Sequence, residues 1–200
     1  MAVLSRGAGS RDQPRDGEAA FVEATRDLLA EGASYDDLSI GRIAERAERT
    51  RTAFYFYFRD KRDLLVKATD QIAAVLYDEA DAWWSGDGGL ADLRVALDNV
   101  LTTYRAHAPF LRAVVEAATY DDEVGRFWRE LVGRFIEATE RRLLADGRQP
   151  DEAHTQAFLL VWMTERACYQ HVVNGGKLSD EALMDGLVGA WQRVGGLPKT

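Results

Sequence analysis

The sequence predicts an all-α protein of about nine helices, and three observations lead to that prediction. Ala, Leu, Arg, Glu and Asp dominate the chain from residue 17 onward. No run of alternating β-branched residues, the pattern of a half-buried strand, interrupts them. Only 4 prolines are present, and 46% of the 200 residues are apolar. That content is enough to bury a core, as one domain or as a small domain attached to a larger one.

The first 60 residues predict an arm followed by three short helices. Residues 1–16 show no periodicity and are expected to form a flexible arm. Residues 17–31 have apolar positions at three- and four-residue spacing, which indicates the first helix. Ser39 and Thr50 are typical N-cap residues for two further short helices. The sequence therefore predicts a small three-helix domain over residues 17–60.

The rest of the chain, residues 61–200, predicts a larger helical bundle. Asp60 is suited to cap a long helix, and a glycine cluster after residue 85 ends it. Pro109 interrupts the next helical pattern, and Ser179 is a candidate N-cap for the last one. The predicted helices of the bundle are residues 61–85, 90–106, 110–118, 123–145, 153–173 and 180–194.

The charge distribution indicates a small cationic module on an acidic body. The net charge of −8 argues at first against a nucleic-acid partner. Residues 42–62, however, hold seven basic and three acidic side chains, whereas residues 68–200 hold 13 basic and 21 acidic ones. A local cationic surplus of this kind favours contact with a polyanion through the N-terminal domain.

Residues 38–65 predict a DNA-binding helix-turn-helix. Ile43, Ala44 and Ala47 form the buried stripe of its first helix, and Phe54 points inward from the second. The polar face of the second helix is left outward, where Arg51 is suited to guanine or phosphate. The predicted DNA-contacting residues, which include the two N-caps, are Ser39, Thr50, Arg51, Thr52, Ala53, Tyr55, Tyr57 and Lys61.

These residues resemble TetR-type repressors. In that family an Ile-Ala pair on the second helix precedes a third helix that ends in a Phe-Tyr-x-Tyr-Phe block, and a Lys opens the next helix. Here the pair is Ile43-Ala44, the block is residues 54–58 and the lysine is Lys61. Members usually have Gly and then an aliphatic residue in the turn, whereas this chain has Glu48 and Arg49. We expect either a strained backbone with positive φ at Glu48, which would cost about 1 kcal/mol, or a slightly different turn.

The bundle predicts a ligand cavity. The polar side-chain ends of Tyr104, Thr139 and Glu165 fall among helices rich in tryptophan, and this mixture favours a pocket. A plain core explains the apolar positions of these helices equally well. Residues 163–166, Met-Thr-Glu-Arg, and Trp191 resemble the ethionamide-regulator branch of the family, and the resemblance implies a long hydrophobic channel. The predicted lining is Tyr104, Trp128, Val132, Phe135, Thr139, Val161, Thr164, Glu165 and Trp191.

The last two helices predict a homodimer. Residues 158–163 are six apolar residues in succession, so that helix must be covered on both sides. Small residues on the final helix, such as Gly186 and Gly189, allow close approach of a second copy. Two helices from each subunit would form a four-helix interface with two-fold symmetry. The expected partners are thus double-stranded, palindromic operator DNA, a small and largely apolar effector, and a second copy of the chain.

Other functions have less support in the sequence. Asp-Glu-Ala-His at residues 151–154 matches a helicase signature by letters, but no P-loop precedes it, so we expect no enzyme. Cys168 and His171 have a spacing suited to a shared metal, yet no further ligand is evident, and we expect no metal and no cofactor. The alternative function is a ligand-binding protein on this fold that has lost DNA binding. The lone cysteine and the absence of a membrane-spanning run favour a cytoplasmic protein.

Overall fold

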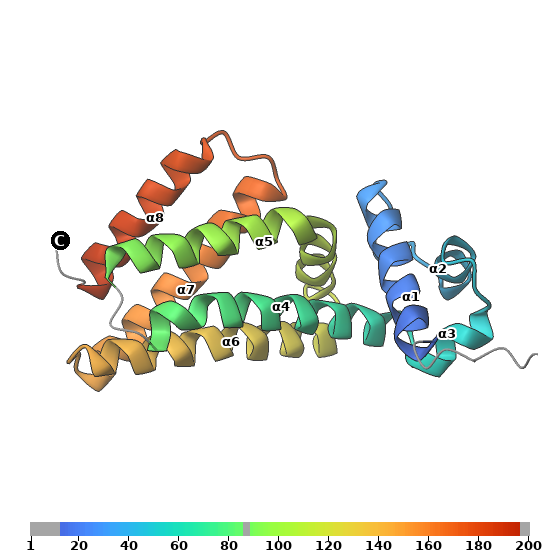
Figure 1. Cartoon of the computed structure of the whole chain (residues 1–200), viewed down its shortest axis with the longest axis horizontal. Helices are drawn as coiled ribbons and strands as arrows, with labels where there is room; N and C mark the ends of the chain where they lie inside the picture. Colours follow the sequence, from blue (N-terminus) through green and yellow to red (C-terminus); the bar gives the residue numbers. More distant parts are fainter. Residues whose placement is uncertain (1–12, 86–88, 197–200) are drawn as a thin grey trace, which may run out of the picture. The chain divides into compact units, whose positions relative to one another are not determined.

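The computed structural model describes residues 13–85 and 89–196, and it is all-α over these ranges (Figure 1). Most helices lie within a few residues of their predicted bounds, so the predicted fold class is confirmed. The helices are α1 (Gln13–Ala30), α2 (Ile40–Arg46), α3 (Arg51–Tyr57), α4 (Lys61–Ser85), α5 (Leu90–Ala117), α6 (Asp122–Ala145), α7 (Pro150–Val172) and α8 (Asp180–Gly195).

Helix α5 is two helices joined at a kink. His107 has a non-helical backbone, with φ −120° and ψ 17°, two residues before Pro109. Proline removes a backbone donor and crowds the preceding turn, which is sufficient to break the regular hydrogen-bond ladder. With α5 counted as two, the described residues contain nine helical segments, as predicted.

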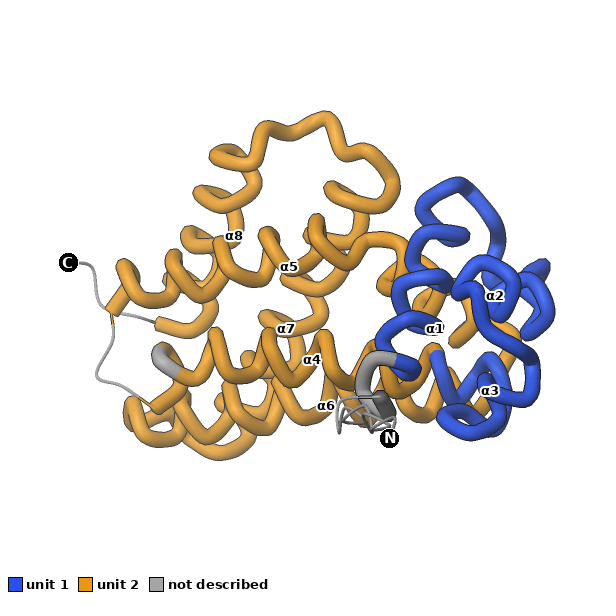
Figure 2. The backbone as a smooth tube through the Cα atoms, turned by 45° about the vertical axis from the view of Figure 1, so that its right-hand side comes forward, with its two compact units in different colours: residues 1–64 blue, residues 65–200 orange. Residues whose placement is uncertain are grey.

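The chain forms two compact units, residues 1–64 and residues 65–200 (Figure 2). The sequence placed this boundary after residue 60, four residues earlier. The reason for the difference lies in the first turn of α4, which is bound to the first unit. Lys61 Nζ donates to the Tyr35 carbonyl oxygen at 3.0 Å, and Asp63 Oδ2 accepts from Arg59 N at 3.0 Å. We call residues 13–64 the head and the described residues from 65 onward the body.

In the head, α1, α2 and α3 pack around an aromatic core. The rings of Phe21 and Phe54 meet edge to face with centroids 5.3 Å apart, and Phe58 lies 5.3 Å from Phe54. All three side chains are buried. The predicted flexible arm over residues 1–16 is wrong for residues 13–16, because α1 already begins at Gln13. Residues 1–12 of that prediction lie outside the described residues.

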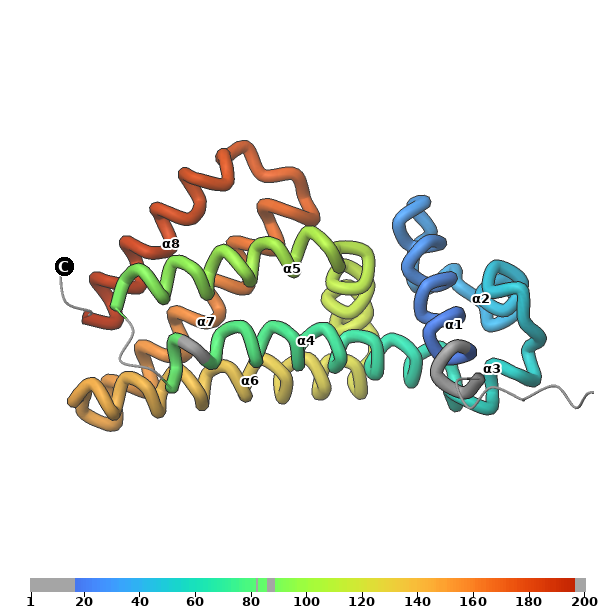
Figure 3. Tube along the Cα trace, viewed as in Figure 1, coloured from blue at the N-terminus to red at the C-terminus, as the bar shows by residue number. Residues whose placement is uncertain are grey.

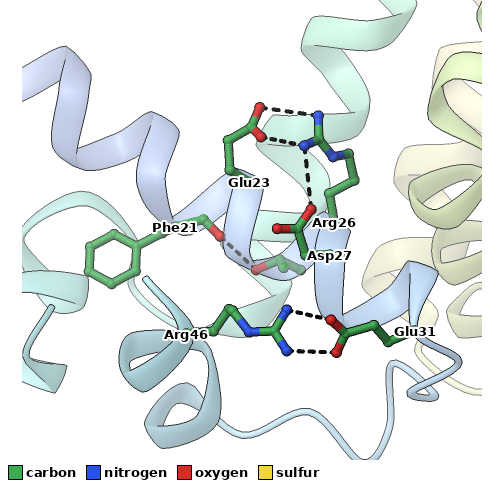
Figure 4. Close-up of polar contacts among 7 residues, drawn as sticks. Phe21, Glu23, Arg26, Asp27, Glu31 and Arg46 are labelled. Carbon is green, nitrogen blue, oxygen red and sulfur yellow. Dashed lines mark hydrogen bonds and ion pairs between the residues drawn. The ribbon is translucent and has the colours of Figure 1, made fainter. Parts of the chain in front are cut away.

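Ion pairs on the surface of the head join α1 to α2. Arg46 of α2 donates through both terminal nitrogens to Glu31, just beyond α1, at 2.8 and 2.6 Å (Figure 4). The Arg46 guanidinium lowers the pKa of the Glu31 carboxyl below its usual 4.5. Within α1, Arg26 is paired with Glu23 in the same view. The Arg46–Glu31 pair links α2 to the residue after α1, and exposed pairs of this kind contribute little to stability.

In the body, the helices that approach each other closely are α6 with α7, α5 with α6, α7 and α8, and α7 with α8 (Figure 3). Helix α4 is joined to them through long side chains. Trp84 Nε1 donates to Thr139 Oγ1 of α6 at 3.2 Å, and the Trp83 ring meets Trp191 of α8 edge to face at 5.2 Å. Across the described ranges, each helix is too short or too polar to span a lipid bilayer.

Candidate functional site

The turn between α2 and α3 contains Glu48, the residue at which the sequence raised the question of backbone strain. Glu48 has a φ of +52°, and it is the only non-glycine residue with positive φ in the described chain. The Glu48 N–H donates to the Glu45 carbonyl at 3.0 Å and the Arg49 N–H to the Ala44 carbonyl at 2.9 Å. This pair of bonds is a Schellman motif, in which glycine is the preferred residue at the left-handed position. Of the two alternatives expected for this turn, the positive φ at Glu48 is the one observed.

Both predicted N-caps of the helix-turn-helix are present. Ser39 Oγ accepts from the Arg42 N–H at 3.2 Å, and Thr50 Oγ1 accepts from the Ala53 N–H at 3.1 Å. Each cap satisfies a backbone donor that the helix itself leaves unpaired. Thr50 follows the Schellman turn directly and begins α3, whereas Ser39 caps the opposite end of α2. The hydroxyls therefore have a structural role, and their contact with DNA stays a prediction.

Helix α3 presents a polar face to solvent. Phe54 is fully buried in the head, whereas Arg51, Thr52 and Tyr55 are exposed and Ala53 is half-buried. The structure therefore brings the predicted readout residues together on one surface. Sequence reasoning missed Phe56, whose side chain is 79% exposed. No apolar periodicity distinguishes it from its neighbours, since every residue of 54–58 is aromatic.

Two of the predicted DNA contacts are engaged inside the head. Lys61 Nζ donates to the carbonyls of Tyr35 and Asp36 at 3.0 and 2.8 Å and lies 4.8 Å from the centroid of the Tyr35 ring. The ring of half-buried Tyr57 packs on Phe21 with centroids 6.1 Å apart. A Cβ at Gly17 would lie 2.3 Å from the Tyr57 hydroxyl, so this side chain covers the first turns of α1. Both side chains therefore make contacts within the head, and phosphate contact by either stays a prediction.

All nine predicted ligand-binding residues line one cavity in the body, with a volume of about 100 Å³. A single water needs roughly 10–15 Å³, so the cavity is larger than a packing void. Its walls are apolar and aromatic, with Tyr104 from α5, Trp128, Val132 and Phe135 from α6, and Trp191 from α8. The structure thus gathers these residues around a space, and their contact with a ligand stays a prediction.

Sequence reasoning missed the wall that α4 contributes. Seven residues of this helix line the cavity at the spacing of a helix face, and they include both residues of the Trp83-Trp84 pair. The i, i+3, i+4 repetition is visible in the sequence and was the available signal. The α4 lining residues are Thr69, Ile72, Ala73, Leu76, Ala80, Trp83 and Trp84.

Two pairs of polar groups on the wall are satisfied within the protein. Thr164 Oγ1 donates to the Leu160 carbonyl at 2.8 Å and accepts from Trp191 Nε1 at 2.8 Å. Thr139 Oγ1 accepts from Trp84 Nε1. Glu165 differs, because its side chain is buried and neither carboxylate oxygen accepts a hydrogen bond from any described residue. The nearest paired charge is Arg166, whose Nε lies 3.5 Å from Oε2.

Burial shifts the acidity of the groups around this carboxyl. Loss of hydration raises the pKa of Glu165 above its usual 4.5, and Arg166 opposes the shift only in part. Burial, with the neighbouring Glu165 charge, raises the pKa of Tyr104 well above 10 and that of Cys168 to about 12. The Cys168 thiol is therefore neutral at physiological pH.

No metal or catalytic centre emerges from the described ranges 13–85 and 89–196. No three His, Cys, Asp or Glu side chains gather there in a metal-binding group. Cys168 is buried, and His171 Nε2 lies 2.8 Å from Asp180 Oδ1, so these two residues serve separate local contacts. The helicase-like letters at residues 151–154 fall in the first turn of α7, where acidic residues favour a helix N-terminus.

Two family models match the chain. Residues 21–68 match the model described as bacterial regulatory proteins of the tetR family, and residues 93–194 match the model described as the C-terminal domain of the transcriptional regulator EthR. The first match covers the helix-turn-helix. The second covers most of the cavity wall outside α4.

Curated relatives and solved structures agree with these models. The HTH-type transcriptional regulator EthR of Mycobacterium tuberculosis strain H37Rv is 26% identical over 200 residues, 96% of this chain and 93% of the relative. EthR of Mycolicibacterium smegmatis is 28% identical over 152 residues, 73% and 70% of the two chains. A TetR-family regulator from Syntrophomonas wolfei has a TM-score of 0.76 at 15% identity, over 91% and 96% of the chains. A regulator from Rhodococcus scores 0.75 at 18% identity, over 92% and 98%. The structural likeness shows the fold.

Proposed function

The chain belongs to the TetR family of DNA-binding transcriptional regulators, with an EthR-type C-terminal domain, and on that premise we propose that it is a repressor released from a palindromic operator by a small, largely apolar ligand. The family is non-enzymatic, which confirms the prediction that the chain is not an enzyme. The observation that carries the proposal is the pairing of an exposed polar face on α3 with an aromatic-lined cavity in the body.

Operator binding is assigned to α3. Arg51 is exposed near the N-terminus of this helix, where recognition helices contact base edges in the major groove. Its guanidinium matches the two acceptors of guanine, and Thr52 and Tyr55 extend the same face. The exposed Phe56 adds an apolar surface suited to sugar or to a thymine methyl group.

We assign to α4 the step by which a bound ligand causes release of the operator DNA. This single helix begins at Lys61 in the head, and its residues 69–84 line the cavity in the body. Because α4 is held to α6 and α8 through long side chains, a ligand that displaces those side chains changes the direction of the helix. A ligand shifts the equilibrium only by its difference in affinity for the two forms. We therefore propose that the ligand-filled form spaces the two heads of a dimer wrongly for the operator.

Homodimerisation is assigned to α7 and α8. Phe158 and Leu159 of α7 are 48% and 54% exposed, although Leu160 beside them is buried. Val194 of α8 is also exposed, and Gly189 and Ala190 next to it are half-buried. Neighbouring apolar residues of this kind are typical of a surface that a partner covers. A two-fold dimer would place two α3 helices about 34 Å apart, or a multiple of that distance.

A gel-shift with DNA from upstream of the protein's own gene tests the proposal. We expect a sequence-specific shift that weakens with salt, because phosphate contacts release counterions. Arg51→Ala should weaken operator binding by about 1–3 kcal/mol with the fold unchanged. Arg26→Ala is the matched control, since it removes the same charge from the head but leaves α3 intact. If no flanking DNA shifts, the chain is the alternative, a ligand-binding protein that has lost DNA binding.

A further inference from the structure

The body cavity contains one polar feature that its apolar character does not explain. Glu165 is about nine-tenths buried, with 7% of its surface exposed, and it lines the cavity. Both of its oxygens lack a hydrogen-bond partner among the described residues. A buried acceptor left without a partner costs about 1–3 kcal/mol, and more when it is charged. An unpaired buried acceptor of this kind is typical of a binding site in which a ligand supplies the missing hydrogen bonds.

The protein supplies no competing cation inside the cavity. Lys, Arg and His are absent from the described residues that line it. Arg166, the nearest cation to Glu165, has a half-exposed side chain and lies over the Tyr169 ring, 5.0 Å from its centroid. The Arg166 Nε atom lies 3.5 Å from Glu165 Oε2 and does not donate a hydrogen bond to it. The carboxylate therefore has room for a second cation, and only a bound molecule can bring it.

The aromatic walls favour the same kind of group. Four tryptophans line the cavity, and indole faces attract cations. Trp84 and Trp191 have their Nε1 donors engaged on Thr139 and Thr164, which fixes the orientation of both rings. The tryptophans that line the cavity are Trp83, Trp84, Trp128 and Trp191. Tyr104 and Phe135 bring the number of aromatic side chains on the wall to six.

We propose that the cavity selects an apolar molecule that carries one cationic nitrogen, with Glu165 as the acceptor of its N–H donors and the surrounding rings as its aromatic wall. This inference rests on the proposed ligand-binding function and names the chemical class of the ligand. The raised pKa of Glu165 agrees with it, because burial outweighs the opposing charge of Arg166 and a second cation would favour the ionised carboxylate.

A neutral hydroxyl is the competing ligand chemistry. Thr69 Oγ1 and Trp83 Nε1 also line the cavity and are also without a hydrogen-bond partner among the described residues. An alcohol would satisfy these two atoms but would leave most of the acceptor capacity of Glu165 unused. We favour the amine because the carboxylate is the group with the larger cost when unpaired.

The test compares 4-phenylbutylamine with 4-phenyl-1-butanol, two probes of the same size that differ in one terminal group. Calorimetric titration of the full chain at neutral pH should give the amine at least a tenfold lower Kd than the alcohol. In Glu165→Gln, which keeps the shape of the side chain, the two Kd values should agree within about threefold. Glu152→Gln is the matched control, because it makes the same substitution at an exposed position of the same helix. Circular dichroism checks that each variant is folded.

Three results would overturn the inference, and they separate it from the proposed function. Equal Kd values in the parent chain, with either probe releasing operator DNA, would leave the repressor mechanism standing and remove the amine preference. A preference that persists in Glu165→Gln would remove Glu165 as the acceptor of the ligand's N–H donors. If neither probe binds at millimolar concentration, ligand binding by this cavity fails as well, whereas the gel-shift still decides operator binding by itself.

Discussion

Replacing Glu48 by glycine should stabilise the head. Glu48 has a φ of +52° at the left-handed position of the Schellman turn between α2 and α3. An L-residue pays about 1–2 kcal/mol in that conformation because its Cβ crowds the following carbonyl. Glycine avoids this cost but loses about 0.5–1 kcal/mol more conformational freedom on folding. The expected net gain of Glu48→Gly is therefore about 0.5–1 kcal/mol.

The measurement must report on the head by itself. All five tryptophans lie beyond residue 64, so tryptophan fluorescence follows the body. Amide hydrogen exchange over α2 and α3 follows local opening of the head. A gain of about 0.5–1 kcal/mol corresponds to roughly two- to fivefold slower exchange of the protected amides in these helices, at about 1.4 kcal/mol per factor of ten.

Two controls make this prediction refutable. Glu48→Ala keeps the Cβ, so it should not slow the exchange. Glu45→Gly places glycine three residues earlier, at an exposed helical position, and should accelerate the exchange by a similar factor. If Glu48→Gly and Glu45→Gly change exchange in the same direction, backbone strain at Glu48 is not what limits the turn, and the reasoning is refuted.

Three further predictions concern packing and ionisation. Gly17→Ala should destabilise the head by about 1–3 kcal/mol, because the new Cβ would meet the Tyr57 hydroxyl, and hydrogen exchange in the head measures this change. Gly133→Ala, whose Cβ meets nothing within 4 Å, should be neutral or stabilising in thermal melts. Cys168, with its pKa raised to about 12, should react with a disulfide reagent only after unfolding. Because the folded pKa of Glu165 lies above 4.5, its folded form binds the proton more tightly than the unfolded chain does. Its contribution to stability is therefore greatest at acidic pH and falls as pH rises through the folded pKa, so Glu165→Gln should gain stability over the parent as pH rises, measured by thermal melts.

The features that the sequence predicted well depend on short-range chemistry. The N-caps Ser39, Thr50 and Ser179 act on donors three residues away, so their local sequence is sufficient to place them. The start of α1 was misplaced although Pro14 follows Gln13 directly, and proline in the first turn is itself a helix-start signal. Glycine at residue 17 was taken as the boundary instead. Its real role is to admit the Tyr57 side chain, a contact 40 residues away that no local pattern encodes.

Long-range contacts also limited the prediction of the sites. Lys61 was placed among the phosphate contacts because it opens a helix, yet its ammonium binds two carbonyls at residues 35 and 36. The apolar stripes on α6 and α7 located much of the cavity, since inward-facing stripes of neighbouring helices meet. Helix α4 has a similar apolar stripe, but a stripe does not reveal whether the helix packs directly against its neighbours or borders a cavity. That distinction depends on long-range side-chain contacts of α4, such as Trp84–Thr139 and Trp83–Trp191, which no local pattern encodes.

The separation between α4 and its neighbours is what connects the cavity to the proposed switch. A helix packed tightly against the body would resist displacement by a ligand, because close-packed interiors are stiff. Helix α4 is held to α6 by side-chain contacts along its length, from Asp70–Arg134 to Trp84–Thr139, and under the proposal it shifts when a ligand rearranges those that line the cavity. The Trp84–Thr139 and Trp83–Trp191 contacts lie near the end of α4 that is far along the chain from the head, where a small change in direction is amplified over the 25 residues of the helix. The same tryptophans form part of the aromatic wall around Glu165, so the group that selects the ligand and the groups that move α4 belong to one cavity.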